Sequence, residues 1–370
     1  MKKLLSTVLA VLCLPFFGAV PAQAEGLSLS AKSAILIDAQ SREVLFQKNA
    51  FVRLPMASTT KIMTALVAIE QGNLDRVVKI DNRARGAEGS SLYLAENESI
   101  TMRDLLYGLL LASANDAAEA IAYEISGSIE DFAALMNKKA YELGLCSTSF
   151  TNPHGLHDEN HYTTAYDLSL ITAAALENKE FAEICATQKA TVALNIDQGT
   201  RYLTNHNKLL RLYNGCIGVK TGFTKKSGRC LVSAAERNGL KLIAVTLNAP
   251  DDWNDHNALL DYGFGNYQRL IFADAGEFSV ALDLMGGGKV TAVNSEKLSA
   301  LLNANHGEIK YKTEVLRPLF APMDKGKIVG KVICYSGEKK IAESPLIITQ
   351  SVELTYKRDF IGWLKKLIGR

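Results

Sequence analysis

The chain has 370 residues, of which 48% are hydrophobic and 22% are charged. This hydrophobic fraction is ordinary for a globular protein, and the length has room for two domains and a sizeable core. The 41 basic and 39 acidic residues almost balance, so no basic surplus indicates a nucleic-acid partner. The length also excludes a small fold held together by disulfides.

The first residues have the pattern of a secretory signal. Two lysines precede an apolar run over residues 4–20, and Ala22-Gln23-Ala24 matches a small-residue cleavage site. We therefore predict a signal peptide over residues 1–24 and an exported mature chain that begins at Glu25. An uncleaved membrane anchor is the alternative, which the short run and the clear cleavage pattern disfavour. Cleavage removes two basic residues and no acidic one, so the mature charges balance.

Strands are predicted at the start of the mature chain, followed by a helical region. Residues 34–38 and 44–47 form a predicted hairpin. The spacing of apolar residues predicts helices over residues 57–70, 103–111, 116–125, 129–143 and 167–178. The second of these follows Thr101, with Asp104 three residues on, in the manner of a capping box.

Strands return in the next part of the chain. Three are predicted, over residues 216–220, 230–235 and 240–247, and a helix over 255–262 follows them. Short turns between the strands imply antiparallel pairing. Strands at both ends of a helical insert predict one antiparallel sheet, assembled from both ends and covered by helices on both faces. We assign this α/β (α+β) unit to residues 25–272.

A small all-β domain is predicted over residues 273–350. Short apolar runs alternate there with turn residues, at 278–282, 289–293, 309–312, 327–333 and 345–348. Five cysteines remain after cleavage, an odd number. Cys216 and Cys230 lie on neighbouring predicted strands and could pair, although we favour unpaired buried thiols. No spacing of Cys and His resembles a metal site, and we expect neither a metal nor another cofactor.

The last segment, residues 351–370, has the pattern of an amphipathic helix. Its apolar residues from Phe360 to Ile368 fall in one arc, and three basic residues occupy the other side. The segment is too short to span a bilayer, so we predict that it lies in the membrane surface. A helix packed on its own domain is the alternative, which Trp363 beside lysines disfavours.

Three short motifs carry the chemistry. They are Ser58-Thr59-Thr60-Lys61, Ser113-Ala114-Asn115 and Lys220-Thr221-Gly222, in this order. Each is common alone, and S-x-x-K occurs again at residues 336–339, in a Gly- and Lys-rich turn that cannot hold a helix. The first S-x-x-K stands apart because its order, spacing and helical context agree with the other two motifs.

Ser58 is the candidate nucleophile and Lys61 its base. Three positions apart on a helix, they share a face, and Ser58 is placed at the helix N-terminus, where the dipole favours a developing alkoxide. Lys61 must be neutral to accept a proton, and both burial and the nearby cation of Lys220 would lower its pKa. The alternative is that Lys61 is a solvated surface residue.

The other two motifs are expected to surround the substrate. Ser113, in a break between helices, is the candidate to relay a proton to the leaving amine, and Asn115 the candidate to orient Lys61 and the substrate amide. The alternative for these residues is a helix stop and cap. We expect Lys220-Thr221-Gly222 to end a strand, with Lys220 and Thr221 binding a carboxylate and Gly222 letting a substrate backbone approach. The backbone N–H groups of Ser58 and Phe223 would form the oxyanion hole.

Three histidines, His154, His157 and His161, stand close together in the sequence. A metal site is the alternative reading of them, but a Pro/Gly-rich stretch without H-x-x-x-H spacing predicts instead a structured loop that floors the cleft.

With these motifs the sequence resembles a low-molecular-mass penicillin-binding protein, a D-alanyl-D-alanine carboxypeptidase of the serine peptidase type. The resemblance covers residues 31–348 and rests on the segments 57–64, 113–116, 161–167 and 219–222. It implies a β-lactamase/transpeptidase-like fold and removal of the terminal D-Ala from peptidoglycan stem peptides outside the cytoplasmic membrane. It also implies acylation of Ser58 by β-lactams. Some relatives carry an arginine after the last catalytic-domain strand, where this chain reads Ala249-Pro250-Asp251-Asp252-Trp253.

Two rival functions remain. A class A β-lactamase needs a glutamate, usually followed four residues later by Asn, and no glutamate between Asn115 and Lys220 has that neighbour. A non-catalytic cell-wall-binding protein would not require the intact set of motifs.

Overall fold

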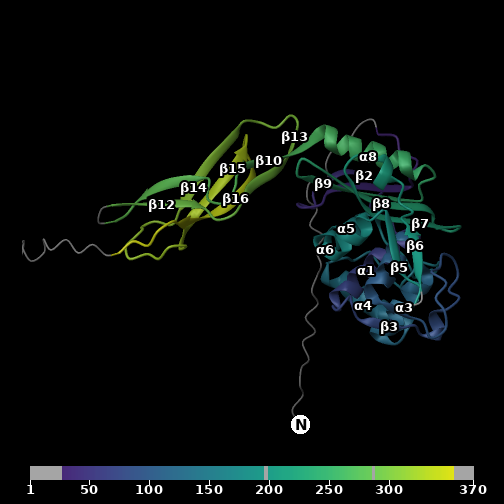
Figure 1. The fold of residues 1–370 in the computed structure, drawn as a ribbon. Coiled ribbons are helices and arrows are strands. Elements are labelled where there is room, and N and C mark those ends of the chain that lie inside the picture. Colours follow the sequence, from purple (N-terminus) through teal and green to yellow (C-terminus); the bar gives the residue numbers. More distant parts are fainter. Residues whose placement is uncertain (1–26, 196–198, 286–287, 354–370) are drawn as a thin grey trace, which may run out of the picture.

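The computed structural model describes residues 27–195, 199–285 and 288–353. The predicted signal peptide and nearly all of the predicted terminal helix lie outside these residues. Figure 1 shows a mixed helical and stranded part that carries β1 to α8, and an elongated part built from strands. In the part of the chain that is described, no helix has the length and hydropathy to cross a membrane.

The larger part is organised around a five-stranded antiparallel sheet in the order β2-β1-β9-β8-β7. Its strands are β1 (Ser33–Asp38), β2 (Val44–Lys48), β7 (Cys216–Thr224), β8 (Gly228–Arg237) and β9 (Leu240–Leu247). Strands from the two ends of this region meet at its centre, where Ile35 of β1 pairs with Val245 of β9. The predicted single sheet, assembled from both ends of a helical insert, is thus confirmed.

Successive side chains of a strand point to opposite faces of the sheet, and here both faces are apolar. Ile35, Ile37 and Val245 belong to one buried cluster, while Leu36 and Leu242 belong to another on the opposite face. Helix α5 (Ala165–Glu177) packs against β1 and β9, and α8 (Asp252–Asn266) packs against β8 and β9. Because the first cluster includes side chains of α5 and the second side chains of α8, helices cover both faces, as the sequence predicts.

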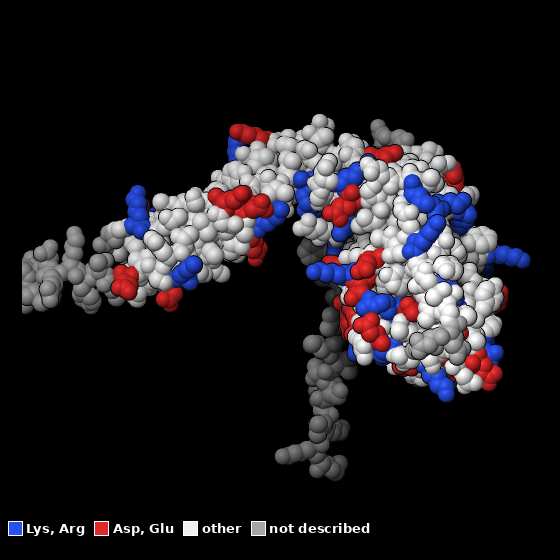
Figure 2. Space-filling view, viewed as in Figure 1, with Lys and Arg blue, Asp and Glu red and all other residues white. Residues whose placement is uncertain are grey.

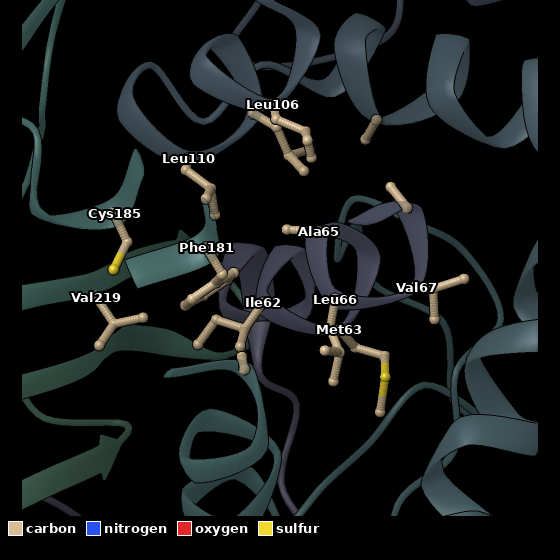
Figure 3. Packing of buried hydrophobic residues seen from close by; sticks show 14 of the residues in the cluster. Ile62, Met63, Ala65, Leu66, Val67, Leu106, Leu110, Phe181, Cys185 and Val219 are labelled. Atoms are coloured by element: carbon tan, nitrogen blue, oxygen red, sulfur yellow. The ribbon is translucent and has the colours of Figure 1, made fainter. Parts of the chain in front are cut away.

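A helical insert packs on the first of these faces. Its helices are α1 (Lys61–Glu70), α2 (Met102–Leu111), α3 (Asn115–Ser126), α4 (Ile129–Glu142), α5 and α6 (Lys179–Ala186). The short α7 (Leu209–Leu212) instead packs Leu209 into the cluster on the opposite face. At the centre of the insert, α1 packs Ile62, Ala65 and Leu66 among side chains from α2, α6 and β7 (Figure 3). Full burial contributes about 1.5–3 kcal/mol for each large aliphatic side chain. This packing therefore fixes the start of α1, which carries the first motif.

Local sequence signals place most of these helices within a few residues of their predicted bounds. The side chain of Thr101 caps α2 by accepting a hydrogen bond from the backbone N–H of Asp104. The sequence did not predict α6, and it also missed two hairpins, formed by β3 (Val77–Lys79) with β4 (Ser99–Thr101) and by β5 (Lys189–Ala193) with β6 (Thr200–Thr204).

One detail of the sheet differs from the predictions, and another confirms them. Strand β7 does not end at the Lys220-Thr221-Gly222 motif but continues to Thr224, because β8 already begins at Gly228, which pairs with Thr224. Cys216 and Cys230 are both unpaired thiols. They lie at different levels of the β7–β8 ladder, opposite Ala235 and Gly222 respectively, so the favoured prediction of free thiols is confirmed.

The elongated part consists of strands. They are β10 (Tyr267–Ala273), β11 (Ser279–Asp283), β12 (Lys289–Asn294), β13 (Leu298–Asn303), β14 (Ile309–Val315), β15 (Ile328–Ser336) and β16 (Lys339–Ile348). They form a sheet in the order β11-β12-β16-β15-β14 and a β10–β13 pair, which confirms the predicted all-β region. The sequence missed β10 and β13. Strand β10 spans the predicted domain boundary between residues 272 and 273. The position of that boundary stays a prediction.

One buried ion pair connects β10 to the central sheet. The guanidinium of Arg269 lies 2.5 Å from the Asp38 carboxylate at the end of β1, and both side chains are buried. Elsewhere, on the face shown in Figure 2, basic and acidic side chains are interspersed.

Candidate active site

The structure brings the three motifs to one cavity of about 620 Å³, whose lining includes Ser58, Ser113, Thr221, Gly222 and Phe223. Each motif arrives on a different element. The 3-10 turn η1 (Ala57–Thr60) leads directly into α1 and carries the serine of the first motif, the break between α2 and α3 carries the second, and β7 carries the third. Segments more than 150 residues apart in the sequence therefore meet at one site.

Lys61 lies at the centre of the site and is fully buried. Its side-chain nitrogen Nζ lies 3.1 Å from Ser58 Oγ, 2.6 Å from Asn115 Oδ1 and 2.8 Å from the backbone oxygen of His154. The alternative of a solvated surface lysine is wrong. Three oxygen partners fix the amine next to the serine hydroxyl, as expected of a nucleophile and its base.

Electrostatics favour a neutral amine at this position. Burial lowers the pKa of Lys61 well below its ordinary value, and the cation of Lys220 lowers it further, although Asp116 opposes the shift. Burial alone lowers the pKa of Lys220 to about 7. The predicted influence of Lys220 on the pKa of Lys61 is thus confirmed, with desolvation as the larger cause.

Strand β7 passes directly beside the serine turn. A Cβ atom on Gly222 would lie 3.0 Å from the backbone nitrogen of Ser58 and 3.1 Å from that of Thr59. Strand β7 is also the last strand of its sheet, so the edge beyond it is available to an extended peptide. Lys220 is buried within this strand, and its Nζ donates to the backbone oxygen of Thr221 at 2.9 Å.

Ser113 and Asn115 border the cavity on the helical side. Ser113 lies between α2 and α3 with a left-handed backbone, φ = 61°, a conformation that is uncommon for a residue with a side chain and is often found at functional sites. Asn115 is the first residue of α3, and its amide nitrogen donates to the backbone oxygen of Glu88. This amide therefore faces Lys61 with its oxygen and the 88–98 segment with its nitrogen.

The histidine-rich loop supports the serine turn from below. His161 Nε2 lies 2.7 Å from Thr60 Oγ1, and Thr64 donates to the backbone oxygen of Pro153 at 2.6 Å. Gly155 packs so closely against Ala57 that it has no space for a side chain. Burial lowers the pKa of His161 to about 4. The loop thus acts as a structured floor, and within the described ranges no group of three potential metal-binding side chains forms.

Two further residues, to which the sequence assigned no role in the site, hold the 88–98 segment in place. The carboxylate of Asp116 accepts hydrogen bonds from Ser91 Oγ and from the backbone nitrogens of Leu92 and Leu94. Arg201 on β6 forms a buried ion pair with Glu98 at 2.6 Å. Local patterns contain no signal for these contacts, because their partners lie 22 to 103 residues apart.

The remaining side of the cavity contains Arg229, Asp252 and Trp253. Asp252 and Trp253 belong to the segment where some members of the resembled family carry an arginine. In this chain the structure places an arginine in the cavity from a different element, β8, and pairs it with Asp252 at 2.9 Å.

Comparison with known proteins agrees with this geometry. Residues 19–251 match the family model described as D-alanyl-D-alanine carboxypeptidase, and residues 276–354 match the model of the C-terminal domain of penicillin-binding protein 5. The D-alanyl-D-alanine carboxypeptidase DacF of Bacillus subtilis is 33% identical over 100% of this chain and 98% of its own. DacA of Haemophilus influenzae is 31% identical over 91% of this chain and 87% of its own.

A solved structure extends the likeness to three dimensions. Penicillin binding protein 5 of Haemophilus influenzae superposes with a TM-score of 0.73 at 29% identity, over 89% of this chain and 99% of that one. The matched family model, the full-length relatives and the shared fold all lead to one conclusion: this chain belongs to the D-alanyl-D-alanine carboxypeptidase family of serine peptidases.

Proposed function

We propose that this serine peptidase removes the terminal D-Ala from peptidoglycan stem peptides through an acyl-enzyme on Ser58. The observation that carries the proposal is the contact of 3.1 Å between Lys61 Nζ and Ser58 Oγ, in a site where burial lowers the pKa of the lysine. A neutral amine at hydrogen-bond distance from a hydroxyl is the arrangement that general-base activation requires.

The reaction can be written with these residues. Lys61 takes the proton of Ser58 Oγ while that oxygen bonds to the carbonyl carbon of the penultimate D-Ala. The N–H groups of Ser58 and Phe223 stabilise the oxyanion. The bond to the terminal D-Ala then breaks, and its amine leaves with a proton relayed through Ser113. Water hydrolyses the remaining ester and regenerates the Ser58 hydroxyl.

Asn115 and the third motif position the substrate in this scheme. Asn115 orients Lys61 through its contact of 2.6 Å and is placed to bind the substrate amide. Lys220 and Thr221 supply positive charge and a hydroxyl for the substrate carboxylate, and Gly222 keeps the strand edge clear. A β-lactam also presents an amide near a carboxylate, and its four-membered ring strains that amide. It therefore acylates the same oxygen, Ser58 Oγ.

Two measurements test the assignment of Ser58. Digestion and mass spectrometry after exposure to penicillin should place the adduct on the peptide that contains Ser58. Ser58→Ala should abolish both the adduct and D-Ala release from an acyl-D-Ala-D-Ala peptide. An adduct on Ser113 or Ser336 would refute the assignment.

We also propose that the protein is exported and held on the outer face of the cytoplasmic membrane. The sequence of residues 1–24 supports export, and the apolar arc and basic residues after residue 356 support attachment to an anionic lipid surface. A mature chain truncated after Lys357 should stay in solution with anionic vesicles and keep its activity on a small peptide, while the complete mature chain should sediment with the vesicles. Identical partitioning of the two chains would contradict the attachment.

A further inference from the structure

Exposed apolar side chains gather at one end of the elongated part. Neighbouring strands of the sheet β11-β12-β16-β15-β14 are antiparallel, so β11, β14 and β16 finish at the same end of the sheet where β12 and β15 begin. Four large apolar residues at this end are between 55% and 65% exposed, namely Met285, Leu316, Phe320 and Ile328. We call these four residues the apolar tip.

The tip is built on a packed core. The backbone nitrogen of Met285 donates to the oxygen of Leu319, and that of Leu316 donates to the oxygen of Val329, each at 2.9 Å. Leu319 and Val329 are buried in the hydrophobic cluster of the elongated part. Because Leu319 fills this core while its neighbour Phe320 is exposed, the segment has a fixed orientation, and its exposed apolar side is a formed surface.

The segment that carries the tip is poor in charge. Residues 315–323 contain one charged side chain, Arg317, and their exposed residues include two prolines besides Leu316 and Phe320. Single exposed apolar residues are common, whereas a group of them indicates a contact surface. Depletion of charge is likewise typical of the centre of a contact.

The position of the tip in the chain indicates its partner. Met323 and Val352 exchange two backbone hydrogen bonds, at 2.9 and 2.8 Å, so the last described residues run beside the tip segment. In Figure 1 this end of the elongated part points away from the larger part. The apolar arc that we expect in the membrane surface begins at Phe360, seven positions after Glu353, and seven residues span at most about 25 Å. A membrane that holds the arc therefore lies within reach of the tip.

The charges around the tip suit an anionic lipid surface. Arg317, Lys325 and Lys327 are exposed, and none of them forms an ion pair with another described residue. The acidic residues nearby are Asp324 and Glu353. Exposed basic residues that flank an apolar surface are typical of segments that lie at anionic membranes.

We propose that the apolar tip inserts into the surface of an anionic lipid membrane, as a second contact beside the C-terminal segment. This inference rests on the proposed attachment and deepens it, because two contacts fix the orientation of the elongated part on the membrane, which one terminal segment leaves free. Four side chains that bury part of their surface bind weakly on their own. The tip therefore acts once the C-terminal segment holds it near the lipid.

The first experiment measures sedimentation of the complete mature chain with vesicles of phosphatidylglycerol and phosphatidylcholine. Leu316→Ser combined with Phe320→Ser should lower the partition coefficient about 10-fold, because two inserting side chains become polar. Ile328→Ser should lower it by a smaller factor. Ile271→Ser is the matched control, since Ile271 is also 55% exposed but lies on β10, which Arg269 connects to the central sheet. This control should sediment like wild type.

The second experiment locates the tip by fluorescence. The chain has two tryptophans, and replacing the one in the C-terminal segment by Trp363→Phe leaves Trp253 in the cavity. In this background, Phe320→Trp should add fluorescence that brominated lipids quench. Tyr141→Trp, at an 81% exposed position on α4, should add fluorescence that they do not quench.

Three results would overturn the inference. They are equal sedimentation of wild type and the Leu316→Ser, Phe320→Ser double variant, an equally large loss in Ile271→Ser, and unquenched Phe320→Trp in membrane-bound protein. The last is expected if the tip binds a second copy of the chain or the C-terminal segment instead of lipid. Failure of the proposed attachment looks different, because the complete wild-type chain would then stay in solution, and the inference would fail with it.

Discussion

Gly155→Ala should destabilise the turn that carries Ser58 and slow the acylation of Ser58, although residue 155 has no role in the proposed mechanism. A Cβ atom at this position would lie 1.9 Å from the backbone oxygen of Ala57. Ordinary contact needs 3.4 Å or more, so the loop and the turn must separate by about 1.5 Å, the difference of these two distances. Ala57 directly precedes the nucleophile, and its oxygen also accepts the hydrogen bond from Thr60 Oγ1.

The magnitude follows from two separate effects. Gly155 has φ = +90°, and a side chain in a left-handed conformation costs about 1–2 kcal/mol. Overpacking adds about 1–3 kcal/mol, so we expect a loss of roughly 2–5 kcal/mol in the free energy of unfolding. Since a displacement of about 1 Å at a reacting group can cost 100-fold in rate, acylation by penicillin should slow by about that factor.

Gly127→Ala is the matched control. Gly127 ends α3 with φ = +79°, and a Cβ atom there would meet nothing within 4 Å. It carries the same backbone cost of about 1–2 kcal/mol without the clash. Thermal unfolding and stopped-flow acylation of both variants separate the two effects. If Gly155→Ala acylates at the wild-type rate and loses no more stability than Gly127→Ala, the reasoning about the floor of the site is wrong.

Two further predictions concern the lysines. Lys61→Arg keeps a cation but cannot easily give up its proton, so the acylation rate should fall by about 10² to 10⁴, the usual contribution of a general base; a stopped-flow rate within threefold of wild type would indicate another base. Burial lowers the pKa of Lys220 to about 7 in the folded chain, against about 10.4 when unfolded. Between these values the unfolded chain binds a proton that the folded chain lacks, so this lysine makes stability rise with pH across that window. Met at position 220 cannot titrate, so Lys220→Met should lack this contribution, and its Tm should gain less than the Tm of wild type between pH 7 and 9.5. Equal changes of Tm in the two proteins would contradict the shifted pKa.

Much of the fold could be predicted because its signals are local. The helical period of α1 to α5, the Thr101 cap of α2 and the alternation in β1 and β9 each depend on residues a few positions apart. Helix α6 and the β5–β6 hairpin escaped prediction because their short segments lack a strong period, and packing against other elements decides their structure. Strand β7 extends beyond its predicted end because the neighbouring strand β8 supplies hydrogen bonds that cannot be predicted from the sequence of β7 alone.

The candidate site divides in the same way. The sequence by itself determined which residue types take part, since Ser58, Lys61 and the other motif residues are recognised by spacing and order. Only the tertiary structure decided how these side chains are buried, oriented and charged. The amine of Lys61 is desolvated and oriented by Asn115 and His154, which lie 54 and 93 residues away, and the cavity acquires Arg229 through an ion pair with Asp252. Burial and charge neighbours depend on which distant segments meet in space, and for that reason no pattern along the chain determines them.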